Sequence, residues 1–402
     1  MLVMRNTDPA IGWFTLSESD RASAARYLDM LSTMDTRDEL GFGAMHFAYA
    51  DRFFPGTSVQ HARLRYVFFV AWTYEELRQA TAGQPFPFEM MKGIEERYSR
   101  RLMQTVPVLQ NSGISGWMKY RDNQLPVVPA SRIYWSSLRS WRLLNPVHER
   151  HDPPSQRDLH RSWPRLVRYE DGGDSARASS AILFDGLPAA PPDWRQKRGR
   201  LPFELTHDEA AYIRHRWRSV RAIDGEAPLL SKLVEAGITP MSLWSDKIQK
   251  VATPRERSAL SYARGAASLA CIARAAYSAL VEQRRNRDLD RSDRVHFDAL
   301  PELIDAHRSQ VLELNVEGLT RDASLDTGLY LFLKRIQSWV SHKDTLADIE
   351  PAIVRHEQDL KDDRAYLSNE TRRADWSKGI AEPLDYRWST VRGLISEVLE
   401  AA

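Results

Sequence analysis

The 402-residue sequence contains one cysteine, Cys271, and no apolar run long enough to form a membrane helix. A single thiol cannot form a disulfide within the chain, and it cannot build a cysteine zinc site. The longest apolar run, around residues 66–72, is far shorter than the about 20 residues that cross a bilayer. Residues 1–10 also lack the apolar segment of a secretory signal. We therefore expect a cytoplasmic protein that makes no contact with a membrane.

Several motifs of catalytic and cofactor sites are missing as well. There is no glycine-rich phosphate loop and no Gly-x-Ser-x-Gly elbow, and residues 41–43 lack the third glycine of a dinucleotide turn. His148 and His151 lie three residues apart between Pro146 and Pro153, whereas a helical zinc motif needs histidines four apart. A solvated loop is the better interpretation of that pair. We expect no metal, no cofactor and no catalytic residue.

An arginine followed after a short interval by a histidine is typical of a class of helical ribonucleases. Four such pairs occur, about the number that chance gives for 46 arginines and 11 histidines. The pair Arg335 and His342 falls on a predicted helix, so a helical ribonuclease stays open as the least favoured function.

The net charge is +2, but residues 119–221 carry a net +7 and the remainder a net −5. A basic middle between acidic ends predicts a surface that faces nucleic acid, either DNA or RNA. The alternative is that arginine-rich composition is spread through the chain without a function of this kind. The candidate side chains are Arg132, Arg139, Arg142, Arg195, Lys197, Arg198 and Arg200. The first three also fit the outward face of a short winged-helix recognition element that begins at Ser131.

Residues 36–74 are predicted to form a buried pair of helices around which the chain is organised. Thr36 and Glu39 have the spacing of a capping box. A helix over residues 44–54 ends where Pro55 and Gly56 favour a turn. A second helix over residues 59–81 is predicted to be capped by one of the two hydroxyl residues that follow, Thr57 and Ser58.

Arg63 and Arg65 lie just before the apolar part of this second helix, where a guanidinium must be paired. One hypothesis is an internal ion pair that locks the two helices together. Its nearest acidic candidates are Asp38, Glu39 and Asp51. The other hypothesis is an anion clamp, in which both arginines act together with free amides at Thr57 and Ser58.

Helical periodicity on both sides of an irregular segment predicts a mainly α-helical protein with an N-terminal helical domain (residues 11–144) and a C-terminal all-α bundle (residues 204–402). Residues 145–203 are rich in proline, glycine and basic side chains, so we expect an irregular linker that buries little. Residues 165–169 and 180–184 look like strands and leave room for one small hairpin.

The C-terminal half carries clear signals for the ends of helices. Thr206 and Glu209 have capping-box spacing, and Gly237 predicts the end of a helix over residues 229–236. Thr253 or Pro254 is expected to start the longest helix, which runs to about Arg287. Later helices are predicted over residues 299–313 and 324–340.

Several short sequence blocks along the chain together carry a resemblance to a protein family. The specific ones are Thr-Arg-Asp-Glu-Leu-Gly at 36–41, Phe-Pro-Gly-Thr-Ser at 54–58, Arg63, Arg65-Tyr66, Phe68-Phe69-Val70 and Trp72. Weaker ones are Ile133-Tyr134-Trp135, the helix start at Leu205-Thr206 and Pro-Leu-Asp-Tyr-Arg-Trp at 383–388. Together they resemble an uncharacterised bacterial domain-of-unknown-function family, number 6361, from about Ile11 to Leu399. The chain departs from the pattern at Met45-His46 and at Ala71.

The family has no established catalytic residues, so the resemblance implies no site. It implies an accessory role in bacterial loci that encode helicases, nucleases or methylases, including anti-phage defence systems. We therefore expect a non-enzymatic adaptor that binds partner proteins of such a locus. The alternative is a nucleic-acid-binding protein that uses the basic middle region.

Overall fold

The computed structural model describes residues 38–81, 84–105, 113–122, 124, 126–146, 152–166, 182–222, 225–377 and 379–401. Within these ranges the chain is mainly α-helical, which confirms the predicted fold class, and its β-structure is one isolated bridge between Leu144 and Phe184. The helices before residue 167 are α2 (Gly43–Phe53), α3 (Tyr66–Ala80), α4 (Phe88–Thr105), α5 (Trp117–Arg121), α6 (Ala130–Ile133), α7 (Trp135–Ser140) and α8 (Gln156–Leu166).

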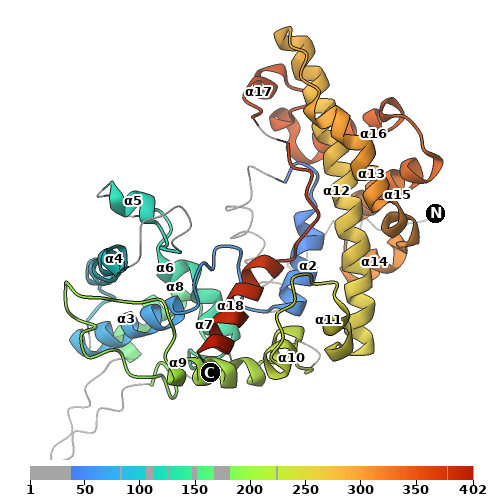
Figure 1. The fold of residues 1–402 in the computed structure, drawn as a ribbon. Coiled ribbons are helices and arrows are strands. Elements are labelled where there is room, and N and C mark those ends of the chain that lie inside the picture. The colour runs from blue at the N-terminus through green and yellow to red at the C-terminus, as the bar shows by residue number, and fades with distance from the viewer. Residues whose placement is uncertain are drawn as a thin grey trace, which may run out of the picture.

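The helices after residue 204 include one that is much longer than the rest, α12, and it packs along α13 (Figure 1). They are α9 (His207–Ser219), α10 (Leu229–Ala236), α11 (Asp246–Val251), α12 (Pro254–Leu289), α13 (Val295–Glu313), α14 (Val316–Asp322), α15 (Thr327–His342), α16 (Leu346–Lys361), the 3₁₀-helix η1 (Asp362–Arg364), α17 (Glu370–Ala374) and α18 (Trp388–Glu400). None of the helices in the described ranges is long and apolar enough to cross a bilayer.

The second helix of the predicted N-terminal pair, α3, begins at Tyr66, later than the sequence indicates. The Thr57 hydroxyl donates to the Phe54 carbonyl at 2.7 Å, and the Ser58 amide donates to Nδ1 of His61 at 3.1 Å. These local bonds hold the intervening residues in turns, because short polar side chains compete with helix formation in this way. The predicted cap at Thr57 or Ser58 is therefore wrong.

The first helix of the pair, α2, is preceded by Asp38, whose carboxylate serves as its cap. Its two oxygens accept the amide hydrogens of Phe42 at 2.9 Å and Gly43 at 2.7 Å. A carboxylate here satisfies free donors and favours the positive end of the helix dipole. Thr36, the predicted partner of Glu39 in a capping box, lies outside the described residues.

Three predictions for the C-terminal half are confirmed at the ends of helices. Thr206 and Glu209 form a capping box at the start of α9, and Thr253 and Glu256 form another at the start of α12. Gly237 ends α10 with a φ of +63°, a conformation that favours glycine. Each of these signals is local, which explains why sequence alone was sufficient.

Two other helices differ from their predictions. Helix α13 begins earlier, because the buried carboxylate of Glu282 accepts the amide hydrogens of His296 and Phe297. The predicted helix over residues 324–340 starts later in the structure, because its first residues form a turn. Helix α15 begins after Asp326, whose side chain accepts from the Leu329 amide at 2.9 Å.

The described part of residues 145–203 contributes to the core, so the expectation that this segment buries little is wrong. Trp163 of α8 has no exposed surface, and Trp194 is 4% exposed. The predicted strand over residues 165–169 is also wrong where it is described, since α8 continues to Leu166. Phe184 of the other predicted strand forms a single bridge to Leu144, which lies outside the predicted hairpin.

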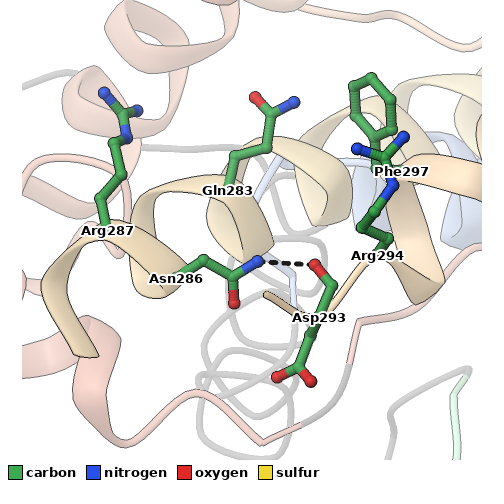
Figure 2. A pocket seen from close by; sticks show the side chains of 6 residues that line it. All are labelled: Gln283, Asn286, Arg287, Asp293, Arg294 and Phe297. Carbon is green, nitrogen blue, oxygen red and sulfur yellow. Dashed lines mark hydrogen bonds between the residues drawn. The ribbon is translucent and has the colours of Figure 1, made fainter. Parts of the chain in front are cut away.

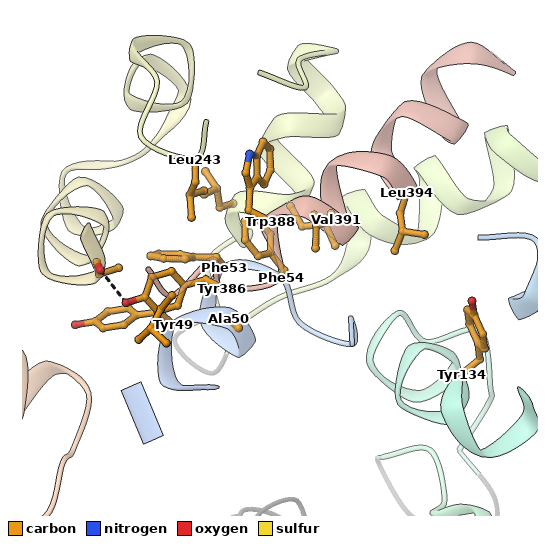
Figure 3. Packing of buried hydrophobic residues seen from close by; sticks show 14 of the residues in the cluster. Tyr49, Ala50, Phe53, Phe54, Tyr134, Leu243, Tyr386, Trp388, Val391 and Leu394 are labelled. Carbon is orange, nitrogen blue, oxygen red and sulfur yellow. Dashed lines mark hydrogen bonds between the residues drawn. The ribbon is translucent and has the colours of Figure 1, made fainter. Parts of the chain in front are cut away.

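The N-terminal helices and the C-terminal segment share one hydrophobic core. Figure 3 shows Tyr49 and Phe54 close to Tyr386 and Trp388. The rings of Phe54 and Trp388 stack with centroids 5.7 Å apart, and the Tyr386 hydroxyl donates to the Ala263 carbonyl of α12 at 2.7 Å. Side chains from both predicted helical domains therefore belong to one contiguous buried cluster.

Candidate functional site

Arg65 forms a buried ion pair with the start of α9. Its Nη2 lies 2.8 Å from Oε1 of Glu209, and its Nη1 donates to the Pro202 carbonyl at 2.9 Å. The two paired side chains are 4% and 3% exposed. A guanidinium at this depth requires such a partner, because an unpaired buried charge is very unfavourable. The predicted partners do not pair with Arg65 in the structure: Asp38, Glu39 and Asp51.

Arg63 instead contacts the C-terminal helix α18. Its Nε lies 2.7 Å from Oε1 of Glu397, whose second oxygen accepts the Leu64 amide at 2.9 Å. The Arg63 guanidinium also lies over the ring of Phe203, 4.8 Å from its centroid. Burial raises the pKa of Glu397, and the Arg63 charge opposes that rise. Both arginines of the proposed clamp thus have partners inside the chain.

The two amides of the proposed anion clamp have internal acceptors too. The Thr57 amide donates to the Phe54 carbonyl at 3.2 Å, and the Ser58 amide donates to His61. Burial lowers the pKa of His61 to about 4, so its ring is neutral and can accept this bond. The geometry of this region is that of a structural junction.

Arg132, Arg139 and Arg142 belong to α6, to α7 and to the turn that follows them. The predicted single helix is interrupted at Tyr134, which leaves pieces of 4 and 6 residues. Arg139 is half-buried and its Nε donates to the Pro153 carbonyl at 3.0 Å, whereas Arg132 and Arg142 are exposed. A winged-helix protein places a longer continuous helix in the major groove, so these short pieces do not match that geometry.

The remaining four candidate residues lie on a loop whose backbone is hydrogen-bonded to a side chain of α4. Arg101 has no exposed surface, and its guanidinium donates to four backbone carbonyls of the loop. The acceptors are the carbonyls of Asp193 at 2.8 Å, Trp194 at 3.2 Å, Gly199 at 3.3 Å and Arg200 at 3.0 Å. The same guanidinium forms an ion pair with the Asp193 carboxylate. We call residues 193–200 the basic loop.

Contacts on both sides of the basic loop add to this anchor. The Trp194 ring stacks against Phe69 and Tyr98 with centroid distances of 5.9 and 5.7 Å. On the far side the Leu201 amide donates to Oγ1 of Thr105 at 2.8 Å. With its backbone and its aromatic side chain fixed in this way, the loop has a defined shape before any ligand binds.

Residues 195–200 of the basic loop carry positive charge and no acidic side chain. Residues 195–200 are all exposed, and four of them are basic. Arg195 reaches Gln79 of α3, whereas Lys197, Arg198 and Arg200 make no side-chain hydrogen bond or ion pair with any described residue. Two carboxylates of this region are engaged elsewhere: Asp193 pairs with Arg101, and Glu76 pairs with Arg97 at 2.6 Å. The loop can therefore offer its charges to an anion without first breaking an internal pair.

The sequence identified the basic side chains of this loop but missed Arg101. Arg101 is one of several charged residues on α4, and their number alone does not single it out. A signal was available, because Arg101 lies seven residues after Ile94 and three after Tyr98, on the face that is apolar at helical spacing. An arginine on such a face predicts a buried partner.

A separate cavity of about 290 Å³ lies at the tip of the α12–α13 hairpin (Figure 2). It is lined by Gln283, Asn286, Arg287, Asp293, Arg294 and Phe297. The Asn286 amide donates to the Asp293 carbonyl at 2.6 Å, and the Arg294 guanidinium covers the Phe297 ring. No sequence motif indicates this cavity, and Arg335 and His342 do not line it.

Other chemistry that the sequence suggested is not assembled in the described chain. Arg335 and His342 are both exposed on α15, and the His342 ring bonds to the Ser338 carbonyl. The described residues contain no group of three histidine, cysteine, aspartate or glutamate side chains that could hold a metal. His148 and His151 lie outside the described residues.

The fold and the basic loop define a helical protein with an anchored cationic surface. The chain belongs to a family of unknown function, DUF6361, whose model matches residues 9–319. This match confirms the family resemblance and includes the basic loop and α12, whereas α15 to α18 follow it. No curated protein and no solved structure matches the chain.

Proposed function

We propose that this protein is a non-enzymatic accessory protein that contacts nucleic acid through the basic loop. The observation that supports the proposal is the group of exposed basic side chains on a loop whose backbone is held by a buried arginine. Clustered cations are the electrostatic footprint of phosphate binding, because they release the counterions of the nucleic acid. Since the loop is already ordered, binding would cost little backbone entropy.

The second part of the proposal is an adaptor role in the cytoplasm, within a bacterial anti-phage defence or DNA-processing system. It is supported by the family resemblance, and the partner proteins would be a helicase, nuclease or methylase encoded nearby. A pull-down from the native host with and without nuclease separates the two parts. Partner proteins that stay bound after nuclease support the adaptor, whereas the loss of all partners leaves nucleic-acid binding alone.

The direct test removes the four charges of the loop together, as Arg195→Ala, Lys197→Ala, Arg198→Ala and Arg200→Ala. We expect this variant to lose nucleic-acid affinity and to keep its helicity, because all four side chains are exposed. The measurement is fluorescence anisotropy over a range of salt concentrations. The slope of log affinity against log salt should become shallower by about 0.7 to 0.9 for each phosphate contact removed.

A matched control removes four exposed charges elsewhere, as Lys247→Ala, Lys250→Ala, Arg291→Ala and Arg321→Ala. The net charge changes equally in the two variants, so a general loss of attraction would weaken both to the same extent. Equal affinities of the two variants, or binding that does not depend on salt, would contradict the proposal.

A further inference from the structure

The basic loop offers phosphate ligands but no surface on which a base could stack. Its aromatic residue, Trp194, is 4% exposed, and the next one along the chain, Phe203, is 1% exposed. Proteins that bind single strands combine a basic groove with exposed aromatic rings on which the bases stack. This loop has the first of those elements without the second.

The exposed aromatic side chain in the described ranges is Phe88, at the start of α4, and it lies far from the basic loop. Thirteen residues of helix separate Phe88 from Arg101, a rise of about 20 Å. The Phe88 ring also packs edge-on against Phe86 and His160, with centroid distances of 4.8 and 5.1 Å. It is therefore placed to cover its neighbours and not to receive a base beside the loop.

The backbone of the basic loop is equally unsuited to reading base edges. Four of its carbonyls point inward to Arg101, so these acceptors are not available to a ligand. Readout in the major groove normally uses a helix or a two-stranded ribbon, and residues 193–200 form neither. The groups that remain accessible are guanidinium and ammonium donors, which complement phosphate oxygens.

The density of phosphates then favours a duplex over a single strand. Six residues of loop span at most about 20 Å. A duplex presents one charge per about 1.7 Å of its axis, about twice the density of each strand alone. Fixed cations on a preformed loop can therefore meet more phosphates on a duplex than on a flexible strand of equal length.

We infer that the basic loop recognises the phosphate backbone of a nucleic-acid duplex, independently of base sequence. This inference rests on the proposed function and narrows its ligand. DNA and RNA duplexes both present a phosphate backbone, so the experiment tests a duplex of each kind.

The experiment measures anisotropy of the full chain with DNA duplexes of two unrelated sequences, the matching single strands and an RNA duplex of equal length. We expect the duplexes to bind more tightly than the single strands, with equal affinity for both DNA sequences. The four-alanine loop variant should lose this difference. Tighter binding of either duplex supports the inference, and the better of the two identifies the natural source.

Tighter binding of a single strand that the loop variant abolishes would overturn the inference while the proposed function stands. A strong preference for one of the two DNA sequences would overturn it as well. Failure of all the nucleic acids to bind would instead refute the proposed function. Circular dichroism of the loop variant shows that a loss of binding is not a loss of fold.

Discussion

The basic loop and the tip of the α12–α13 hairpin are both rich in arginine, yet their charges are arranged differently. Between residues 284 and 294 five arginines alternate with three aspartates, whereas residues 195–200 contain four basic residues and no acidic one. Three ion pairs lie at the tip, Arg284–Glu350, Arg294–Asp298 and Arg373–Asp288, and they involve two of its five arginines. The cations of the loop have no such acidic partners in the described chain.

The two regions differ in the acidic side chains that lie among the cations, so the number of cations alone does not define a candidate anion surface. The net +7 of residues 119–221 includes side chains that are already used inside the protein. Arg139 bonds to a carbonyl and Arg216 pairs with Asp185, so neither adds to an open surface. A regional charge sum overestimates the surface available to nucleic acid for this reason.

The largest effect is expected for Arg101→Met, which keeps the apolar stem and removes the guanidinium. Four carbonyls and the Asp193 carboxylate then lose their donor, and we expect the protein to lose about 3 kcal/mol of stability. Urea denaturation measures this loss. Trypsin should also cleave faster between residues 195 and 200, because the loop is no longer held against α4.

The adjacent Arg100→Met is the matched control. Arg100 is 44% exposed and pairs with Glu96 one turn away, so its loss should cost about 0.5 kcal/mol or less. If both variants were equally stable, or if the loop of Arg101→Met resisted trypsin as the wild type does, Arg101 would not be its anchor.

Much of the fold could be predicted from the sequence because the signals are local. The capping box at Thr206, the start of α12 at Thr253 and the glycine at 237 act within one turn of helix, and each was found where it was expected. The predicted helix start at Thr57 or Ser58 was wrong because the Ser58 amide donates to His61 and stabilises a turn instead. This competing hydrogen bond is also local in sequence, but it depends on the position in which the His61 ring is held.

The partners of the buried charges could not be predicted, because they lie far away in the sequence. Glu209 is 144 residues from Arg65, and Glu397 is 334 residues from Arg63. Single-sequence patterns carry no information on such pairs. The basic side chains of the loop were predictable as candidates, but the anchor that makes them a defined surface depends on tertiary packing.

The raised pKa of Glu39 leads to a prediction about how stability depends on pH. Burial raises the pKa of Glu39 to about 7, so the folded protein holds a proton there that the unfolded chain releases near pH 4.5. The folded state is therefore destabilised as the pH rises from about 4.5 to 7. Glu39→Gln should remove this loss and be more stable than the wild type above pH 7. Other groups titrate in the same interval, so the measurement is the difference in unfolding free energy between the two proteins. A difference that stays constant with pH would contradict the assignment.

The smallest effect on both stability and affinity is expected at the hairpin tip. Arg294 and Asp298 are each 62% exposed, and an exposed pair one turn apart contributes about 0.5 kcal/mol or less. Arg294→Ala should therefore change neither the stability nor the duplex affinity by a measurable amount. Arg198→Ala on the loop should match it in stability but bind duplexes less tightly, because its charge has no partner among the described residues. Urea denaturation and anisotropy on the same two variants make the comparison. Equal losses of affinity would show that the paired cations of the tip also serve as a binding surface, and the distinction between the two regions would then be wrong.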